Sequence, residues 1–190
     1  MPEVGNARFG SSVAKVRLVE VIRDPDAAKL VSDPMRRAIL NLLRQRSLTE
    51  AGLAENLGLT DATVNYHLQL LKRAGFITVA KREEEEHGIM QKFYAPSAYL
   101  YLPDVGALPM EVSRYFYPIN IERARGVLSV KGDHSDIAGP DGREVDRLGE
   151  DLAKMLVVVA RRYASREVNQ GEGEVLVGRI YKEALAKLKR

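Results

Sequence analysis

The sequence predicts a mainly α-helical fold with a small β-hairpin, followed by a second helical region. Three observations lead to this prediction. Apolar residues recur at helical spacing in three short segments between residues 33 and 75, and capping residues separate these segments. Two segments of alternating polarity, 76–82 and 89–95, then predict a hairpin. Beyond residue 96 the tyrosines concentrate, and a long amphipathic period follows from about residue 143 to 168.

The composition limits the class of protein. Of the 190 residues, 45% are hydrophobic and 29% are charged, which excludes global disorder. Cysteine is absent, which excludes disulfides, cysteine zinc sites and thiol catalysis. No apolar run approaches the roughly 20 residues of a membrane span, and the first dozen residues lack a signal-peptide pattern. We therefore expect a cytoplasmic protein without a membrane partner.

The elements before the hairpin can be assigned in order. Residues 1–14 show no period and are expected to be a flexible N-terminus, whereas residues 15–22 alternate and predict a short strand. Asp24 and Pro25 start a turn or a first helix. Asp33 can cap the next helix, with Pro34 at the first helical position, where its missing N–H costs nothing. Ser47 to Thr49 end that helix and cap the one that follows.

The last two helices and the hairpin complete a recognisable order. Gly58 ends the second helix, Thr60 can cap a third helix over about 60–74, and Gly75 ends it. The apolar face of this third helix consists of Val64, Leu68 and Leu71. Helix, short helix, turn, helix and hairpin is the order of a winged helix-turn-helix. We assign residues 15–98 to this DNA-binding domain, with the wing at 76–95.

The C-terminal half, 99–190, is predicted to be a helical dimerisation and effector region. Residues 131–142 form a loop by composition, 170–173 are expected to break the helical pattern, and a last helix follows. The long helix, about 143–168, has an apolar stripe wide enough for a partner, although the same stripe can pack within the chain. The residues assigned to a dimer interface are Leu148, Leu152, Met155, Leu156, Val159 and Tyr163.

Residues 48–82, LTEAGLAENLGLTDATVNYHLQLLKRAGFITVAKR, carry a specific spacing of Leu59, Thr60, Val64, Asn65, His67, Leu68, Leu71, Ala74, Gly75, Phe76 and Ile77. This segment resembles the core of ArsR-type winged-helix transcriptional regulators. Residues 33–40 resemble the family's "D-x-x-R-x-x-I-L" helix. The wing resembles the long wing of archaeal members through Ala80, Lys81, Arg82, Gly88, Lys92, Phe93 and Tyr94. In such members, C-terminal helices commonly form the dimer.

The resemblance implies a homodimeric, sequence-specific regulator that binds double-stranded DNA. The recognition helix would enter the major groove, and the wing would contact the backbone. Founding members sense metals through a Cys-x-Cys or through Asp and His sets on the last helix, and this chain has neither pattern. We therefore expect no metal and no cofactor. No catalytic motif is present, and we expect no enzyme activity.

The exposed face of the recognition helix supplies the candidate base-reading residues. Asn and Gln side chains suit paired contacts with adenine, and a small methyl can pack on thymine. The candidates are Asp61, Ala62, Asn65, Tyr66 and Gln69. Asp61 is equally explained as a first-turn carboxylate that the helix dipole favours.

Basic residues concentrate around this motif. Residues 29–82 hold nine basic and four acidic residues, a net +5, against +3 for the whole chain. This excess favours contact with phosphates. The candidates for DNA backbone contacts are Arg36, Thr60, Thr63, Lys72, Arg73, Lys81, Arg82 and Lys92. Four glutamates, 83–86, would repel phosphate; they fit a solvated wing tip or a contact with a basic partner.

Other readings stay open. The chain could be a winged-helix protein-interaction module in a transcription or repair assembly, which the acidic wing tip favours. His67 shares the buried stripe, so we expect a packed, hydrogen-bonded histidine rather than a ligand. Asp133, His134 and Asp136 give only a weak metal signal. The aromatic stretch 99–117 forms either plain core or the lining of a small-ligand pocket. The sequence leaves the operator and any effector undetermined.

Overall fold

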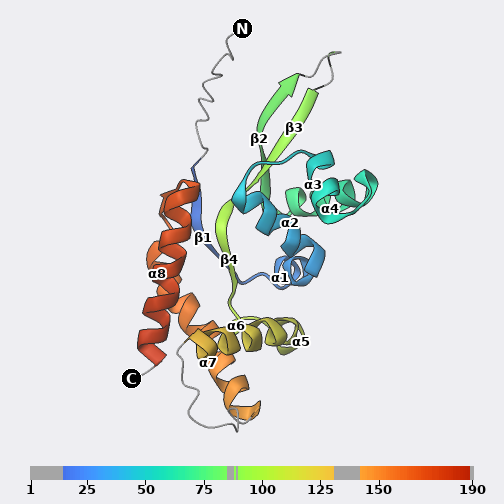
Figure 1. The fold of residues 1–190 in the computed structure, drawn as a ribbon. Helices are drawn as coiled ribbons and strands as arrows, with labels where there is room; N and C mark the ends of the chain where they lie inside the picture. The colour runs from blue at the N-terminus through green and yellow to red at the C-terminus, as the bar shows by residue number, and fades with distance from the viewer. Residues whose placement is uncertain (1–14, 85–87, 89, 131–141, 189–190) are drawn as a thin grey trace.

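A computed structural model describes residues 15–84, 88, 90–130 and 142–188 (Figure 1). The first half contains, in chain order, β1 (Val16–Ile22), α1 (Pro25–Ser32), α2 (Pro34–Gln45), α3 (Glu50–Leu57), α4 (Asp61–Arg73), β2 (Ile77–Glu84) and β3 (Met90–Pro96). The second half contains β4 (Ala98–Pro103), α5 (Met110–Ser113), η1 (Arg114–Phe116), α6 (Tyr117–Val130), α7 (Gly142–Ala160), η2 (Arg161–Tyr163), β5 (Glu167–Val168) and α8 (Gln170–Leu188). Within the described residues, no helix combines the length and apolarity needed to cross a membrane.

The helices of the first half begin where the sequence predicts. Asp33 caps α2 by accepting a hydrogen bond from the Arg36 amide, and Thr60 caps α4 by accepting one from the Thr63 amide. Gly58 and Gly75 follow α3 and α4 with φ angles of 64° and 77°, a left-handed conformation that side chains disfavour. Local capping chemistry therefore sets the boundaries of the helix-turn-helix.

The wing is an antiparallel hairpin that projects away from the helices (Figure 1). Ile77 lies opposite Pro96 at its base, and Glu84 lies opposite Met90 near its tip. Leu48 exchanges two backbone hydrogen bonds with Tyr94, which fixes the start of α3 to the base of the wing. The fold of this half is a winged helix-turn-helix, as the sequence predicts.

A second, three-stranded sheet joins the two ends of the chain in the order β4-β1-β5. β1 runs parallel to β4 and antiparallel to β5. The sequence predicts β1 but neither β4 nor β5. The long helix ends at Ala160 instead of the predicted 168, because η2 turns the chain and β5 then pairs with β1, where the Leu18 amide donates to the Arg166 carbonyl at 2.7 Å.

Two hydrophobic cores result. The first combines α1 to α4 and the base of the wing with buried side chains of α5 and η1. The second combines β1 and β4 with α7 and α8, and it contains Leu18, Leu152, Leu156 and Val159. The expected division into 15–98 and 99–190 separates β1 from the strands and helices on which it packs. We therefore propose that 15–22 belongs with the C-terminal unit.

The start of α8 corrects a second expectation. Residues 170–173 were expected to break the helix, but they form its first turn. Asn169 accepts a hydrogen bond from the Glu172 amide, and Glu172 accepts one from the Asn169 amide, a reciprocal capping box. Gly173 faces Tyr99 so closely that a Cβ there would lie 2.5 Å from the ring. The glycine is needed for packing.

Several expectations concern residues outside the described ranges. These are the expected flexibility of residues 1–14, the weak metal signal at Asp133, His134 and Asp136, and half of the expected acidic wing tip, Glu85 and Glu86.

Candidate nucleic-acid interface

Helix α4 presents one buried and one exposed face. Its buried face is Val64, Leu68 and Leu71, which pack into the first core against α2 and α3. Thr60 holds the N-terminus of the helix, and its hydroxyl lies 2.8 Å from that of Thr63. The helix is thereby fixed along its whole length, and its opposite face is turned outward.

Four of the five candidate base-reading residues are exposed on that outer face: Asp61, Ala62, Tyr66 and Gln69. Tyr66 stands out because 61% of its surface is exposed, an unusual position for a large aromatic side chain. Its ring packs at a steep angle, 69°, to the His67 ring, and the two ring centroids lie 5.4 Å apart. The outer face therefore combines an aromatic ring with an amide and a carboxylate, all free to meet a partner.

Asn65, the fifth candidate, is half-buried and tied to α3. Its Nδ2 donates to both carboxylate oxygens of Glu50, at 3.1 and 3.0 Å. A carboxylate only accepts hydrogen bonds, so it holds the amide nitrogen inward and turns the Asn65 oxygen away. Asn65 is thus oriented, and its carbonyl oxygen is the group it can offer to a ligand.

Glu50 was missed by the sequence reasoning. It lies 15 residues before Asn65, at the first position of α3, where an acidic residue is already explained by the helix dipole. Only the packing of α3 against α4 brings the two together. Its place in the first turn was therefore not a usable signal for this role.

His67 is half-buried on α4, near the predicted stripe. Its Nδ1 atom is buried without a hydrogen-bond partner among the described residues. The sequence predicts a hydrogen-bonded histidine, and the structure does not show a hydrogen bond at this nitrogen. The His67 ring packs against the ring of Tyr66.

The candidate backbone contacts divide into free and committed cations. Lys72 and Arg73 are exposed at the end of α4, and Arg82 lies opposite Lys92 across the wing. None of these four forms an ion pair within the described part of the chain. Lys81 lies 2.5 Å from the Glu83 carboxylate and 4.1 Å from the centroid of the Phe93 ring, so it is partly engaged.

Arg36 has a structural role instead. Its side chain is only 14% exposed, its Nε donates to the Leu30 carbonyl at 2.5 Å, and its guanidinium lies 3.7 Å from Asp33. It joins the end of α1 to the start of α2. We therefore remove Arg36 from the candidate backbone contacts, because moving it to a phosphate would leave the α1 carbonyl without its donor.

The residues assigned to a dimer interface fall into two groups. Leu152, Leu156 and Val159 are buried inside the chain against β1, β4 and α8. These three residues therefore pack within the chain, which was the alternative to a dimer contact for this stripe. Leu148, Met155 and Tyr163 are half-buried, and the Tyr163 hydroxyl donates to Glu183 of α8 at 2.7 Å.

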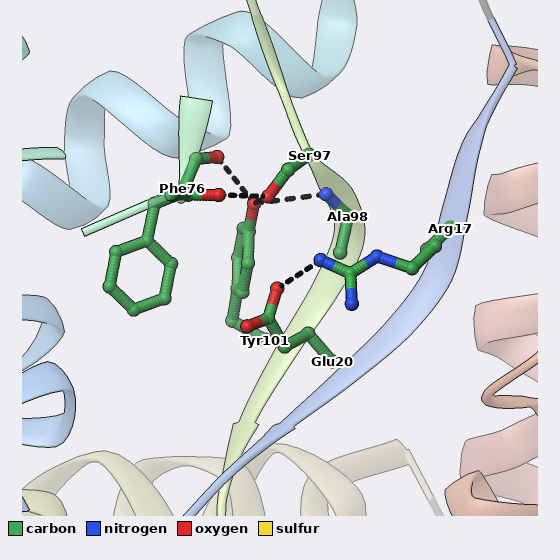
Figure 2. Close-up of polar contacts among 7 residues, drawn as sticks. Arg17, Glu20, Phe76, Ser97, Ala98 and Tyr101 are labelled. Carbon is green, nitrogen blue, oxygen red and sulfur yellow. Dashed lines mark hydrogen bonds and ion pairs between the residues drawn. The ribbon is translucent and has the colours of Figure 1, made fainter. Parts of the chain in front are cut away.

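The end of α4 is connected to β4 by a small hydrogen-bond network (Figure 2). The Tyr101 hydroxyl donates to the Phe76 carbonyl at 2.6 Å and accepts from the Ala98 amide at 2.9 Å. Ser97 donates from its hydroxyl to the Gly75 carbonyl at 2.7 Å. Burial raises the pKa of Tyr101, so its hydroxyl stays protonated and able to donate. Gly75 and Phe76, shortly after α4, are thereby held by Ser97, which precedes β4, and by Tyr101 within β4.

Comparison with known proteins agrees with this fold. Residues 31–80 match a family model described as a helix-turn-helix domain, a segment that includes α2, α3, α4 and the start of the wing. The chain is also similar to the transcriptional repressor SdpR of Bacillus subtilis (strain 168), with 38% identity over 50 residues. That match covers 26% of this chain and spans about half, 56%, of the repressor.

Two solved structures are also similar to part of the chain. The Mycobacterium tuberculosis protein Rv0081 aligns at a TM-score of 0.35 and 20% identity, over 56% of this chain and 89% of that one. The homodimeric winged helix-turn-helix DNA-binding domain of Mycobacterium bovis Mb0332, described as a possible ArsR-family transcriptional regulator, aligns at 0.31 and 20% identity, over 60% of this chain and 83% of that one.

Proposed function

We propose that this chain is a transcription regulator that binds DNA in a sequence-specific manner, with α4 in the major groove. The observation that carries the proposal is the outer face of α4, where Tyr66 and Gln69 are exposed while Val64, Leu68 and Leu71 anchor the helix. A helix with such a face fits the major groove and can hydrogen-bond base edges. The family match over α2 to α4 supports this assignment.

Asn65 has a narrower role in this proposal than its residue type suggests. Because Glu50 holds its amide nitrogen, Asn65 offers an oxygen, which accepts from the amino group of adenine or cytosine. Gln69, whose side chain is exposed, can still form the paired contact with adenine. Asp61, Ala62 and Tyr66 complete the proposed reading face.

The proposed phosphate contacts lie at both sides of this face. Lys72, Arg73, Arg82 and Lys92 are exposed cations near the end of α4 and along the wing, and Lys81 can join them by exchanging Glu83 for a phosphate. Thr60 and Thr63 at the start of α4 are the proposed neutral contacts. Each neutralised phosphate releases counterions, which makes binding depend on salt.

We propose that the protein acts as a homodimer, because one small winged helix reads too few base pairs to select an operator. Of the six residues assigned to a dimer interface, Leu148, Met155 and Tyr163 are half-buried and can still contact a second copy of the chain. A protein that sediments as a monomer at micromolar concentration, alone and with its selected DNA, would contradict the dimer.

Selection from a random duplex pool tests the function. The bound sequences should share a palindromic motif, and Gln69→Ala should reduce the preference at one position by about 1–3 kcal/mol while leaving binding to random DNA nearly unchanged. Lys72→Ala should instead weaken all sequences and lower the salt slope by about 0.9. Lys182→Ala, an exposed lysine on α8, is the matched control and should change neither.

The alternative function predicts a different result. If Asn65→Ala, Tyr66→Ala and Gln69→Ala all keep the wild-type sequence preference, α4 does not read DNA. A protein-interaction module that uses the acidic wing tip would then be the better description.

A further inference from the structure

A pocket of about 400 Å³ lies between the helix-turn-helix and the C-terminal unit. Side chains of α2 form one wall and β4 forms another, and residues of α6, α7 and α8, with Val31, Val105 and Phe116, complete the lining. Its volume falls within the roughly 300–1,000 Å³ of small-molecule sites. The pocket therefore touches both hydrophobic units and is large enough for a small organic ligand.

Helix α2 lines this pocket with one face and packs into the first core with another, and Leu40 belongs to both. Arg37, Leu40, Asn41 and Arg44 line the pocket at positions three, four and seven residues apart, which places them on one face of the helix. Ile39 and Leu43, on a different side of the helix, are fully buried in the first core. The pocket wall is thus a face of the helix-turn-helix itself.

The pocket lining carries an excess of positive charge. Arg37, Arg44 and Arg123 line it, whereas Glu174 is the carboxylate among the described lining residues and accepts a hydrogen bond from Tyr99 at 2.6 Å. None of the three arginines forms an ion pair among the described residues. Arg37 donates to the Ser32 carbonyl at 2.6 Å through one Nη only, and Arg44 lies 5.4 Å from the centroid of the Tyr99 ring, so Arg37 keeps further N–H groups for a ligand. Burial lowers the pKa of Arg37, Asp33 opposes this effect, and the charge of Arg123 lowers the pKa further. The positive charges of Arg37 and Arg123 therefore repel each other. An anion bound near both would offset this repulsion.

Asn120 is a second, independent sign of a missing ligand. This residue lines the pocket and is only 5% exposed, and its Nδ2 has no hydrogen-bond partner among the described residues. A buried donor without an acceptor is rare in folded proteins. A turn of this amide toward the pocket would let an acceptor oxygen of a ligand satisfy it.

The remaining walls are apolar or aromatic. Tyr101, Phe116 and Ile119 line the pocket together with Leu102, Val177 and Tyr181. We propose that this pocket binds an organic carboxylate, with its charged group near Arg37 and Arg123 and its apolar body against these side chains. Inorganic phosphate is negatively charged but has no apolar body. It therefore tests whether the negative charge alone is enough for binding.

The pocket also has a route to α4. Tyr101 lines the pocket, and its hydroxyl donates to the carbonyl of Phe76, three residues after the end of that helix, and accepts from the Ala98 amide at the start of β4 (Figure 2). The Phe76 and Tyr101 rings pack edge to face, with 5.1 Å between their centroids. A ligand that displaces Tyr101 would therefore shift the end of α4. This second step, a change in DNA affinity, rests on the proposed function.

Binding can be tested on the full chain without DNA. The probes are benzoate, phenylacetate, indole-3-acetate and octanoate, each paired with its neutral amide, plus inorganic phosphate, and binding is measured by calorimetry. At least one carboxylate should bind with a Kd below about 1 mM, and its amide should bind roughly tenfold more weakly. Arg123→Gln should weaken the carboxylate roughly tenfold. Arg125→Gln, on the same helix but paired with exposed Glu122 outside the pocket, should leave it unchanged.

Three results would overturn the proposal: no carboxylate in the panel binds, acid and amide bind equally, or phosphate binds as well as the best carboxylate. Arg37→Gln provides a second variant if Arg123→Gln lowers the melting temperature. With a selected DNA duplex, the bound carboxylate should change the affinity severalfold. Ser97→Ala, which removes the hydroxyl bonded to the Gly75 carbonyl at a residue outside the pocket lining, should keep carboxylate binding but reduce this change. If the protein binds a carboxylate but does not bind DNA, the proposed ligand site would stand and only the proposed function would be refuted.

Discussion

The two hydrophobic cores of this chain are built in different ways. The first gathers its helices from consecutive segments of the sequence, from α1 through the wing, and adds Ile22 at the end of β1, Leu108 and a short piece of α5 and η1. The second joins β1, near the start of the described chain, to β4, α7 and α8, which lie roughly 80 to 170 residues later. Local signals can specify the first core, whereas the second depends on contacts between distant segments.

The cores are nevertheless connected. Ile22 at the end of β1 is buried in the first core, and Tyr101 of β4 bonds to the residues that follow α4. Asp104 pairs with Arg23 at 3.1 Å and with Arg161 at 2.9 Å, so one buried carboxylate links the start of α1 to η2. We therefore expect the cores to unfold together.

The largest expected effect tests this coupling. Leu68→Ala in the first core and Leu156→Ala in the second each remove a fully buried side chain and should lower the free energy of unfolding by about 2–5 kcal/mol. Each variant should shift one shared transition in urea, followed by circular dichroism and tyrosine fluorescence. Val158→Ala, an exposed position on the same helix as Leu156, should change little. Two separate transitions would show that the cores are independent.

A smaller effect tests the close packing of the second core. Gly173→Ala would place a Cβ 2.5 Å from the Tyr99 ring and should cost about 1–3 kcal/mol of stability. Gly178→Ala, on the same helix with open space around it, should stabilise by up to about 1 kcal/mol. Thermal melts of the two variants should move in opposite directions. If both raise the melting temperature, Gly173 has no packing role.

A local signal in the first unit should have a more modest cost. Thr60→Ala removes the side-chain cap of α4 and should destabilise by about 1 kcal/mol, whereas Thr60→Ser keeps the accepting oxygen and should be nearly neutral. Urea unfolding measures both. Equal loss in the serine variant would indicate that the methyl group, and not the cap, stabilises this helix start.

The smallest effect is a pH dependence of the contact between α8 and η2. The hydrogen bond from Tyr163, aided by Arg162, lowers the pKa of Glu183 below its ordinary value of 4.5. Because the pKa of Glu183 is lower in the folded state, the ionised carboxylate adds to the free energy of unfolding. This stabilisation is fully present above about pH 4.5 and is lost as the pH falls through the pKa of the folded state. Glu183→Gln should narrow the difference between melting temperatures at pH 7 and pH 3. Lys182→Ala, its neighbour, should not.

The sequence predicted the first unit well because its signals are local. Asp33, Thr60 and Gly75 each act within four residues along the chain, so their roles can be seen without a structure. The second unit lacked such signals. β4 ends at Pro103 in a stretch rich in tyrosine, and its partner strand is about 80 residues earlier. Tyr163 and Val168 continue the helical spacing of α7, yet Val168 is buried in a strand.

The candidate interface shows the same limit. The outer face of α4 followed from spacing alone, because its buried residues identify the opposite side. The pairing of Asn65 with Glu50 and the internal role of Arg36 did not, since each depends on how one helix lies against another. The apparent break at Gly171 and Gly173 was wrong because the capping pair Asn169 and Glu172 outweighs the two glycines.

The parallel pairing of β1 with β4 has a consequence for exchanging parts of this protein. The whole winged helix lies between these two strands, so it forms their crossover connection. In a parallel pair the chain leaves one strand and enters the next at opposite ends, here about 20 Å apart for seven residues. Most domains that tolerate insertion have neighbouring termini. A winged helix grafted in place of residues 23–97 would need termini separated by that strand length, which makes this unit hard to swap for an ordinary one.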